Sequence, residues 1–322
     1  MELLIQIAIF VISFLLIIRG GDAFVDAALS IGRKIGISTL VLGATIVSLT
    51  TTLPELFVST FASAEGHVDM AIGNAIGSII CNTGLILGLC AVLSPMALNG
   101  ASQVKKAALL LFSIVTILVM TFFGAIHWYE GLILYCILGA YVLMNLKEAR
   151  SAPPEETGEN DYSGKTPVKF ALGAAAIVLG SRLLVNSASA IAEMLHVPEK
   201  LIALSLVALG TSLPELVTSL TAIRKKEAGL SIGNIIGANI LNIVLVMATS
   251  SLFAKGGLTT SVAESGVLAG LDQLQVLDLP VALLMGMVLL FCAMRKKVTR
   301  GTGIALLGVY AGYLGFVAYA TL

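Results

Sequence analysis

The sequence predicts an all-α integral membrane protein whose ten transmembrane helices form two inverted five-helix repeats. Three observations support this: an apolar composition, ten long apolar stretches, and a pair of motifs that returns at a constant offset. Of the 322 residues, 57% are hydrophobic and only 12% are charged, whereas a soluble domain carries about 25% charged residues. Lipid is therefore the expected solvent for most of the chain.

Ten apolar stretches have about the length of a membrane-spanning helix, which needs roughly 20 residues. They occupy 2–22, 38–63, 70–95, 106–124, 128–146, 168–190, 199–222, 230–253, 275–294 and 302–321. The stretches are continuous, which excludes the alternating ten-residue segments of a membrane barrel. The first stretch opens with Glu2 and lacks the basic segment of a secretory signal, so we expect it to remain as a span.

The basic residues predict the orientation of these spans. Most of the 19 Lys and Arg residues follow odd-numbered spans or flank those loops, and only Lys200 and Lys255 lie in loops on the other side. Because basic loops favour the cytoplasm, both termini are expected on the outer side of the cell membrane. The polar segment 147–167 is expected to be a flexible cytoplasmic linker. It would separate a first repeat, 1–146, from a second, 168–322.

An internal repeat organises the chain. A Leu-Pro-Glu motif at 53–55 and a Gly-Asn-x-x-Gly motif at 73–77 both return 160 positions later. Aligned without gaps, residues 41–82 and 201–242 share 16 identities in 42 positions. Five predicted spans separate each motif from its copy, so the second copy must cross the membrane in the opposite direction. Inverted repeats of this kind are typical of secondary transporters, whose substrate site lies near the bilayer midplane between the repeats.

Two acidic residues lie within these apolar helices. An ionised carboxylate at the position of Glu55 or Glu215 costs about 2.5 to 3.5 kcal/mol or more unless it is compensated. Pro54 and Pro214 precede the two acids, and a proline inside a helix removes a backbone hydrogen bond and frees a carbonyl. Broken helices are tolerated in a membrane where they line a cavity. The repeat therefore predicts a buried site lined by carboxylate and carbonyl oxygens.

Further polar side chains stand near each acid. The candidates are Thr51, Thr52, Thr211 and Ser212 before the acids, and Asn74, Ser78, Asn82, Asn234 and Asn242 on the following helices. Hard oxygen donors favour calcium, sodium or magnesium over zinc or copper. The four cysteines show no metal-binding spacing, and we expect no resident cofactor. Because an empty site would leave two acids uncompensated, the pattern favours exchange of cations over their one-way release.

The paired motifs resemble the two α-repeats, here about 38–95 and 199–253, of the sodium/calcium exchanger family among the cation/calcium antiporters, in its prokaryotic form. The resemblance implies a sodium/calcium antiporter that works by alternating access. It implies that calcium is held by Glu55 and Glu215, with carbonyls of Thr51 and Thr211, and with Asn82 and Asn242. It also implies sodium ligands at Ser48, Thr52, Ser78, Ala208, Thr211, Ser212 and Ala238. The expected partners are calcium and sodium ions and the lipid bilayer, with no nucleic acid and no obligate protein partner.

Alternatives remain at this stage. Many family members carry Ser where Ala238 stands, and a glutamate pair can also bind protons, so calcium/proton or potassium-dependent exchange is the first alternative. The calcium/proton branch resembles Gly-Asn-x-x-Glu, and Gly77 and Gly237 stand here at the position of that final Glu. This difference argues against proton coupling. An intramembrane enzyme is less favoured, because the histidines lie near predicted span ends without repeated partners. A passive channel is less favoured because inverted, proline-broken halves suit alternating access.

Overall fold

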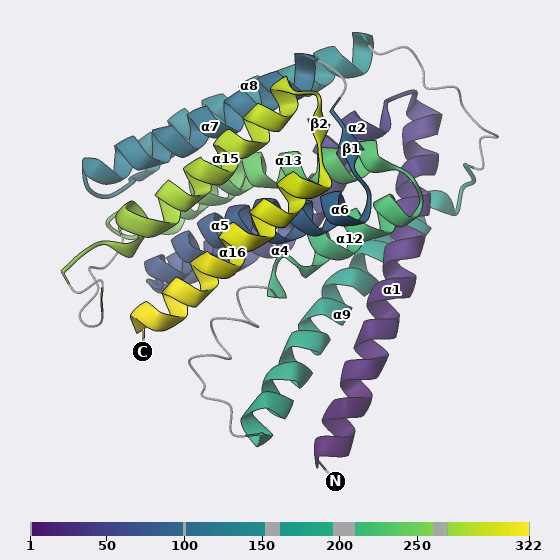
Figure 1. Cartoon of the computed structure of the whole chain (residues 1–322), viewed down its shortest axis with the longest axis horizontal. Helices are drawn as coiled ribbons and strands as arrows, with labels where there is room; N and C mark the ends of the chain where they lie inside the picture. The colour runs from purple at the N-terminus through teal and green to yellow at the C-terminus, as the bar shows by residue number, and fades with distance from the viewer. Residues whose placement is uncertain are drawn as a thin grey trace.

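The computed structural model describes residues 2–98, 101–151, 162–195, 210–259, 267 and 270–321. In the first half, the elements are α1 (Glu2–Ile35), α2 (Thr39–Leu42), the π-helical η1 (Gly43–Val47), α3 (Ser48–Thr51), α4 (Leu53–Glu65), α5 (Val68–Cys81), the π-helical η2 (Asn82–Leu87), α6 (Gly88–Leu93), β1 (Met96–Ala97), α7 (Ala101–Phe122) and α8 (Trp128–Ser151). In the second half, they are α9 (Thr166–Met194), α12 (Leu213–Arg224), α13 (Ala228–Leu241), the π-helical η4 (Asn242–Met247), α14 (Ala248–Phe253), the π-helical η5 (Leu274–Asp278), α15 (Leu279–Met294), β2 (Lys297–Val298) and α16 (Arg300–Thr321). Figure 1 shows their arrangement.

The predicted all-α membrane fold is confirmed. Within the described residues, eight helices are long and apolar enough to cross a membrane, and a ninth span results if 39–51 and 53–65, bent by 42°, are counted together. The predicted span 199–222 lies partly outside the described residues, and its described part contains α12. The only sheet in the described part is the antiparallel pair of β1 and β2.

The first helix is longer than the predicted 2–22, because the residues after the apolar stretch are buried by other helices. Phe24 and Val25 are fully buried in a cluster with residues of α2, α9 and α12. The helix ends before Gly36, whose φ of 72° lies in the left-handed region that favours glycine. Figure 1 shows α1 side by side with α9. A Cβ at Gly20 would lie 2.8 Å from the Ala176 Cβ, so the two helices pack at very short range.

Ion pairs join this helix pair to α12. Asp22 of α1 pairs with Arg224 of α12. Asp26 accepts a bond of 2.7 Å from the Lys225 amino group and lies 3.8 Å from that of Lys169 on α9. Three helices that are far apart in sequence are therefore tied at one end by charges of opposite sign.

The centre of the molecule is built by the two Gly-Asn helices. The spans 228–253 and 68–93 are buried by the rest of the protein more completely than the other six long spans of the described part. Helix backbones meet directly here, because a Cβ at Gly233 would lie 2.2 Å from the Leu40 carbonyl oxygen and one at Gly43 would lie 2.3 Å from that of Leu230. Small residues allow such close approach. As a result, α2 and η1 of the first half pack against α13 of the second.

We predict that Gly233→Ala destabilises the protein by about 1 to 3 kcal/mol or more, because the added methyl overpacks a backbone contact. Thermal unfolding of the purified protein in detergent measures this. Gly139→Ala on α8 is the matched control, since no described atom lies within 4 Å of a Cβ there. Equal unfolding temperatures for the two variants would contradict the packing argument.

Candidate ion-binding site

Two helix breaks position the acidic residues. In the first half the helix is interrupted at Thr52, with φ −81° and ψ −5°, and α4 begins at the next residue with proline in its first turn. In the second half Ser212 has nearly the same conformation, φ −85° and ψ 1°, directly before α12. The prolines therefore begin new helices, as their lack of an N–H permits. Glu55 and Glu215 lie in the first turns of these helices and both are 0% exposed.

A hydrogen bond joins the Glu215 carboxylate to the residue directly before α4, the helix that carries Glu55. The donor is the hydroxyl of Thr52, three positions before Glu55, at 3.4 Å from Glu215 Oε1. Both carboxylate oxygens of Glu55, and Oε2 of Glu215, have no hydrogen-bond partner among the described residues. Buried polar atoms without partners are rare in folded proteins. Three carboxylate oxygens at one place therefore indicate a site for a ligand that carries positive charge.

Several predicted ligands share this lack of partners. Within the described part of the chain, the buried side-chain polar atoms without a hydrogen bond include those of Ser78, Asn82, Ser212 and Asn242. Asn82 and Asn242 each begin a π-helical segment, η2 and η4 respectively. Hydroxyl, amide and carboxylate oxygens are the donors that calcium and sodium prefer. The set fits a hard cation.

Polar side chains of the two halves are hydrogen-bonded in a symmetric pattern around the acids. The Thr51 hydroxyl donates to Asn234 Oδ1 at 3.2 Å, and the Thr211 hydroxyl donates to Asn74 Oδ1 at 3.0 Å. Each threonine thus bonds to the asparagine of the opposite repeat. The hydroxyl of Thr211 is used in this bond, and its carbonyl remains a candidate ligand. The two halves are locked together beside the carboxylates.

Each asparagine also bonds within its own repeat, to a serine that sequence reasoning missed. Asn74 Nδ2 donates to Ser59 Oγ at 2.9 Å, and Asn234 Nδ2 donates to Ser219 Oγ at 3.2 Å. The signal was present, because both serines stand four positions after a glutamate and are related by the offset of 160. They are buried residues that orient the asparagines.

The remaining predicted ligands have different surroundings. Ser48 donates to the Thr45 carbonyl at 3.2 Å, and a Cβ at Gly237 would lie 2.5 Å from its Oγ. Ala238 is fully buried on α13 and is the repeat counterpart of Ser78. Ala208 lies outside the described residues.

A cavity of about 310 Å³ adjoins the two breaks. It is lined by Pro54 and Pro214, by Gly210 and Thr211, and by Ser181 and Arg182 of α9, among others. Ser181 Oγ is buried and has no partner among the described residues. Both helix breaks are therefore adjacent to one cavity between α9 and the central helices.

Comparison with known proteins identifies the family. The sequence profile described as sodium/calcium exchanger protein matches residues 5–147 and 165–319. The chain belongs to the sodium/calcium exchanger family. It is therefore a multi-pass membrane protein of a transporter family, and the alternative of an intramembrane enzyme is set aside.

Individual proteins are similar to this chain over most or nearly all of its length. The sodium/calcium exchanger MaX1 of Methanosarcina acetivorans is 30% identical, over 98% of this chain and 99% of its own. The inner membrane protein YrbG of Escherichia coli is 35% identical, over 79% of this chain and 82% of its own. The solved structure of the sodium-calcium exchanger NCX_Mj, soaked with sodium and strontium, superposes with a TM-score of 0.82 at 32% identity and covers 99% of both chains.

We predict that Thr51→Val lowers the unfolding free energy by about 1 to 3 kcal/mol, because it leaves the fully buried Asn234 oxygen without its donor. Thr211→Val should cost less, because its acceptor Asn74 is only half-buried. Thr50→Val is the control, since the Thr50 hydroxyl donates to Ile46 O within its own helix. Thermal unfolding in detergent tests the comparison. A cost at Thr51 no larger than at Thr50 would show that the cross-repeat bond does not stabilise the fold.

Proposed function

We propose that this chain exchanges sodium for calcium across the membrane, by alternating access at the site between the two repeats. The observation that carries the proposal is the pair of fully buried glutamates, one from each half, three of whose four carboxylate oxygens have no hydrogen-bond partner among the described residues. The names of MaX1 and NCX_Mj, both sodium/calcium exchangers, support the same ion couple.

The calcium site would contain both glutamates. Their two negative charges match one divalent cation, and calcium accepts 6 to 8 oxygen ligands in loose geometry. The carbonyls of Thr51 and Thr211 adjoin the helix breaks, and the amides of Asn82 and Asn242 are buried without partners among the described residues. These groups supply enough oxygen for one calcium ion.

Sodium would use overlapping ligands, proposed as Ser48, Thr52, Ser78, Ala208, Thr211, Ser212 and Ala238. Several sodium ions can neutralise the same two carboxylates that one calcium ion neutralises. The two cargoes therefore compete for one pair of charges. If the protein changed between its outward-facing and inward-facing states with neither ion bound, two uncompensated acids would stand in the membrane interior, which is costly. This coupling favours exchange over passive flow.

We also propose the domain division and orientation that the basic residues suggest. Residues 1–146 and 168–322 would be the two inverted repeats, joined by a cytoplasmic linker at 147–167. Both termini would lie outside the cell membrane, because the basic loops favour the cytoplasm.

Uptake of radioactive calcium into sealed vesicles tests the proposal. Uptake is expected only when sodium is loaded on the opposite side. Uptake driven instead by a proton gradient, or only when potassium is also present, would replace sodium/calcium exchange by the corresponding alternative. Calcium entry without any counter-ion would indicate a channel.

We predict that Glu55→Gln or Glu215→Gln reduces sodium-driven calcium uptake by more than about 100-fold, because losing about 3 kcal/mol of cation binding weakens affinity by roughly that factor. The variants should fold, since glutamine has the same shape as glutamate. Glu65→Gln, at the exposed end of α4, should leave uptake unchanged. Normal uptake by both site variants would rule out the assigned site.

We predict that Ala238→Ser lowers the sodium concentration for half-maximal uptake by about two- to tenfold, which corresponds to a hydroxyl contribution of roughly 0.5 to 1.5 kcal/mol. The substitution adds an oxygen at the repeat counterpart of Ser78. Ser78→Ala should change the same quantity in the opposite direction. If Ala238→Ser leaves the sodium dependence unaltered, position 238 does not contact sodium.

A further inference from the structure

The helix that carries Ser48 has an irregular turn directly before it. In a regular α-helix the Ser48 N–H would donate to the Ala44 carbonyl. Here it donates to the carbonyls of Gly43 and Thr45 instead, and residues 43–47 form the π-helical η1. Single π-helical turns are often found at functional sites. The turn leaves the Ala44 carbonyl available for a donor from elsewhere.

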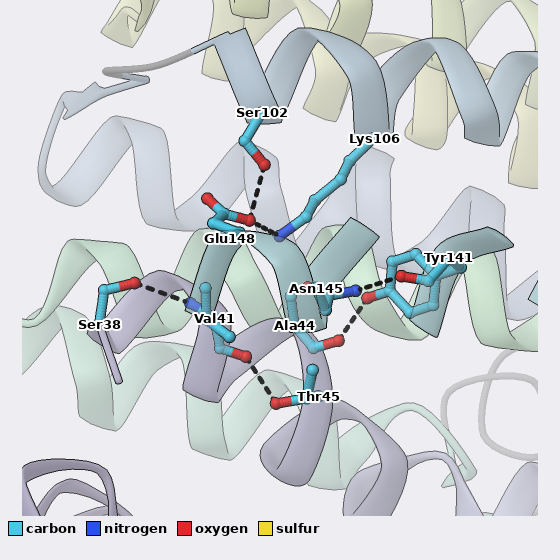
Figure 2. A network of polar contacts seen from close by, with 9 residues as sticks. All are labelled: Ser38, Val41, Ala44, Thr45, Ser102, Lys106, Tyr141, Asn145 and Glu148. Atoms are coloured by element: carbon cyan, nitrogen blue, oxygen red, sulfur yellow. Dashed lines mark hydrogen bonds and ion pairs between the residues drawn. The ribbon is translucent and has the colours of Figure 1, made fainter. Parts of the chain in front are cut away.

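That donor comes from α8. The Tyr141 hydroxyl donates to the Ala44 carbonyl, and Figure 2 shows the two groups pointing toward each other across the interface between α8 and η1. The Tyr141 side chain is 2% exposed, so water does not compete for this bond. Without the hydroxyl, a buried carbonyl would have to find another donor, and the regular bond from Ser48 is the nearest one.

Tyr141 is itself held in place. Asn145 Nδ2 donates to the Tyr141 carbonyl at 2.9 Å, one helical turn away. Further along α8, the Glu148 carboxylate forms an ion pair with the Lys106 amino group at 2.7 Å and accepts a hydrogen bond from the Ser102 hydroxyl at 2.6 Å, both on α7. Lys106 is 1% exposed, and Figure 2 shows its side chain extending from α7 to Glu148. These contacts fix this end of α8 against α7.

The opposite side of η1 is equally confined. A Cβ at Gly237 of α13 would lie 2.9 Å from the Ala44 Cα and 2.5 Å from Ser48 Oγ. The segment is therefore held between α13 and the Tyr141 hydroxyl. A change in the η1 turn would move Ser48 first, because Ser48 begins the next helical segment.

We propose that Tyr141 is a positioning residue for sodium: its bond to the Ala44 carbonyl maintains the π-helical turn that places Ser48 in the ion site. The inference rests on the proposed function, in which Ser48 is a ligand for sodium and not for calcium. Loss of the hydroxyl should therefore weaken sodium binding selectively. A residue that acts only on overall stability would not distinguish the two ions.

Tyr141→Phe tests this, because it removes the hydroxyl and keeps the buried ring. Tyr135→Phe is the matched control: it lies on the same helix, and its hydroxyl bonds to Thr249 Oγ1 at 2.8 Å in the other half. The half-saturating sodium and calcium concentrations are measured from vesicle uptake. For each purified variant, the rise in unfolding temperature with added sodium or calcium is also measured, relative to its own ion-free value.

Tyr141→Phe is expected to raise the half-saturating sodium concentration by about tenfold. This is the lower end of the effect seen when a residue that supports a metal ligand is replaced. The half-saturating calcium concentration should change by less than about twofold. Tyr135→Phe should change neither. Equal shifts for both ions, or no shift beyond that of Tyr135→Phe, would overturn the role of Tyr141. Absence of sodium-driven uptake in the unaltered protein would instead overturn the proposed function, and the sodium titration of thermal stability would still test Tyr141.

Discussion

The burial of two carboxylates, one from each half, is the constraint on which the rest of this structure depends. Glu55 and Glu215 are excluded from solvent, and an ionised acid in a membrane interior is costly without compensation. The protein does not compensate them with a lysine or arginine within the described residues. Neighbouring hydroxyls and amides form a hydrogen-bonded frame beside them, and most of the carboxylate oxygens have no hydrogen-bond partner in the part of the chain that the structure describes.

The frame and the ligands differ in symmetry. The bonds from Thr51 and Thr211 to the opposite asparagines are related by the repeat, and so are the bonds from the asparagines to Ser59 and Ser219. The proposed ligand positions are not equivalent, because the counterpart of Ser78 is Ala238. The symmetric frame places the same hydrogen bonds beside both acids. The asymmetry of the proposed ligands would favour unequal binding of small cations by the two halves.

Sequence patterns predicted the features that depend on local chemistry. The apolar stretches predicted the helices, and the two prolines predicted the breaks that the structure places at Thr52 and Ser212. The longer first helix was not predicted, because Phe24 is buried by residues from other helices rather than by lipid. The bond from Tyr141 to Ala44 joins positions 97 residues apart, and nothing in the local sequence of either residue specifies it.

The π-helical turns connect the local sequence with contacts between distant helices. η2 and η4 begin at Asn82 and Asn242, which are related by the repeat, and η1 directly precedes Ser48. A π-helical turn widens the helix and changes the direction of the side chains that follow, and it also releases a backbone bond that must be satisfied elsewhere. At η1 the Tyr141 hydroxyl meets that requirement. At η1 the irregular turn therefore depends on a donor from another helix, and the outer helix α8 takes part in building the centre of the molecule.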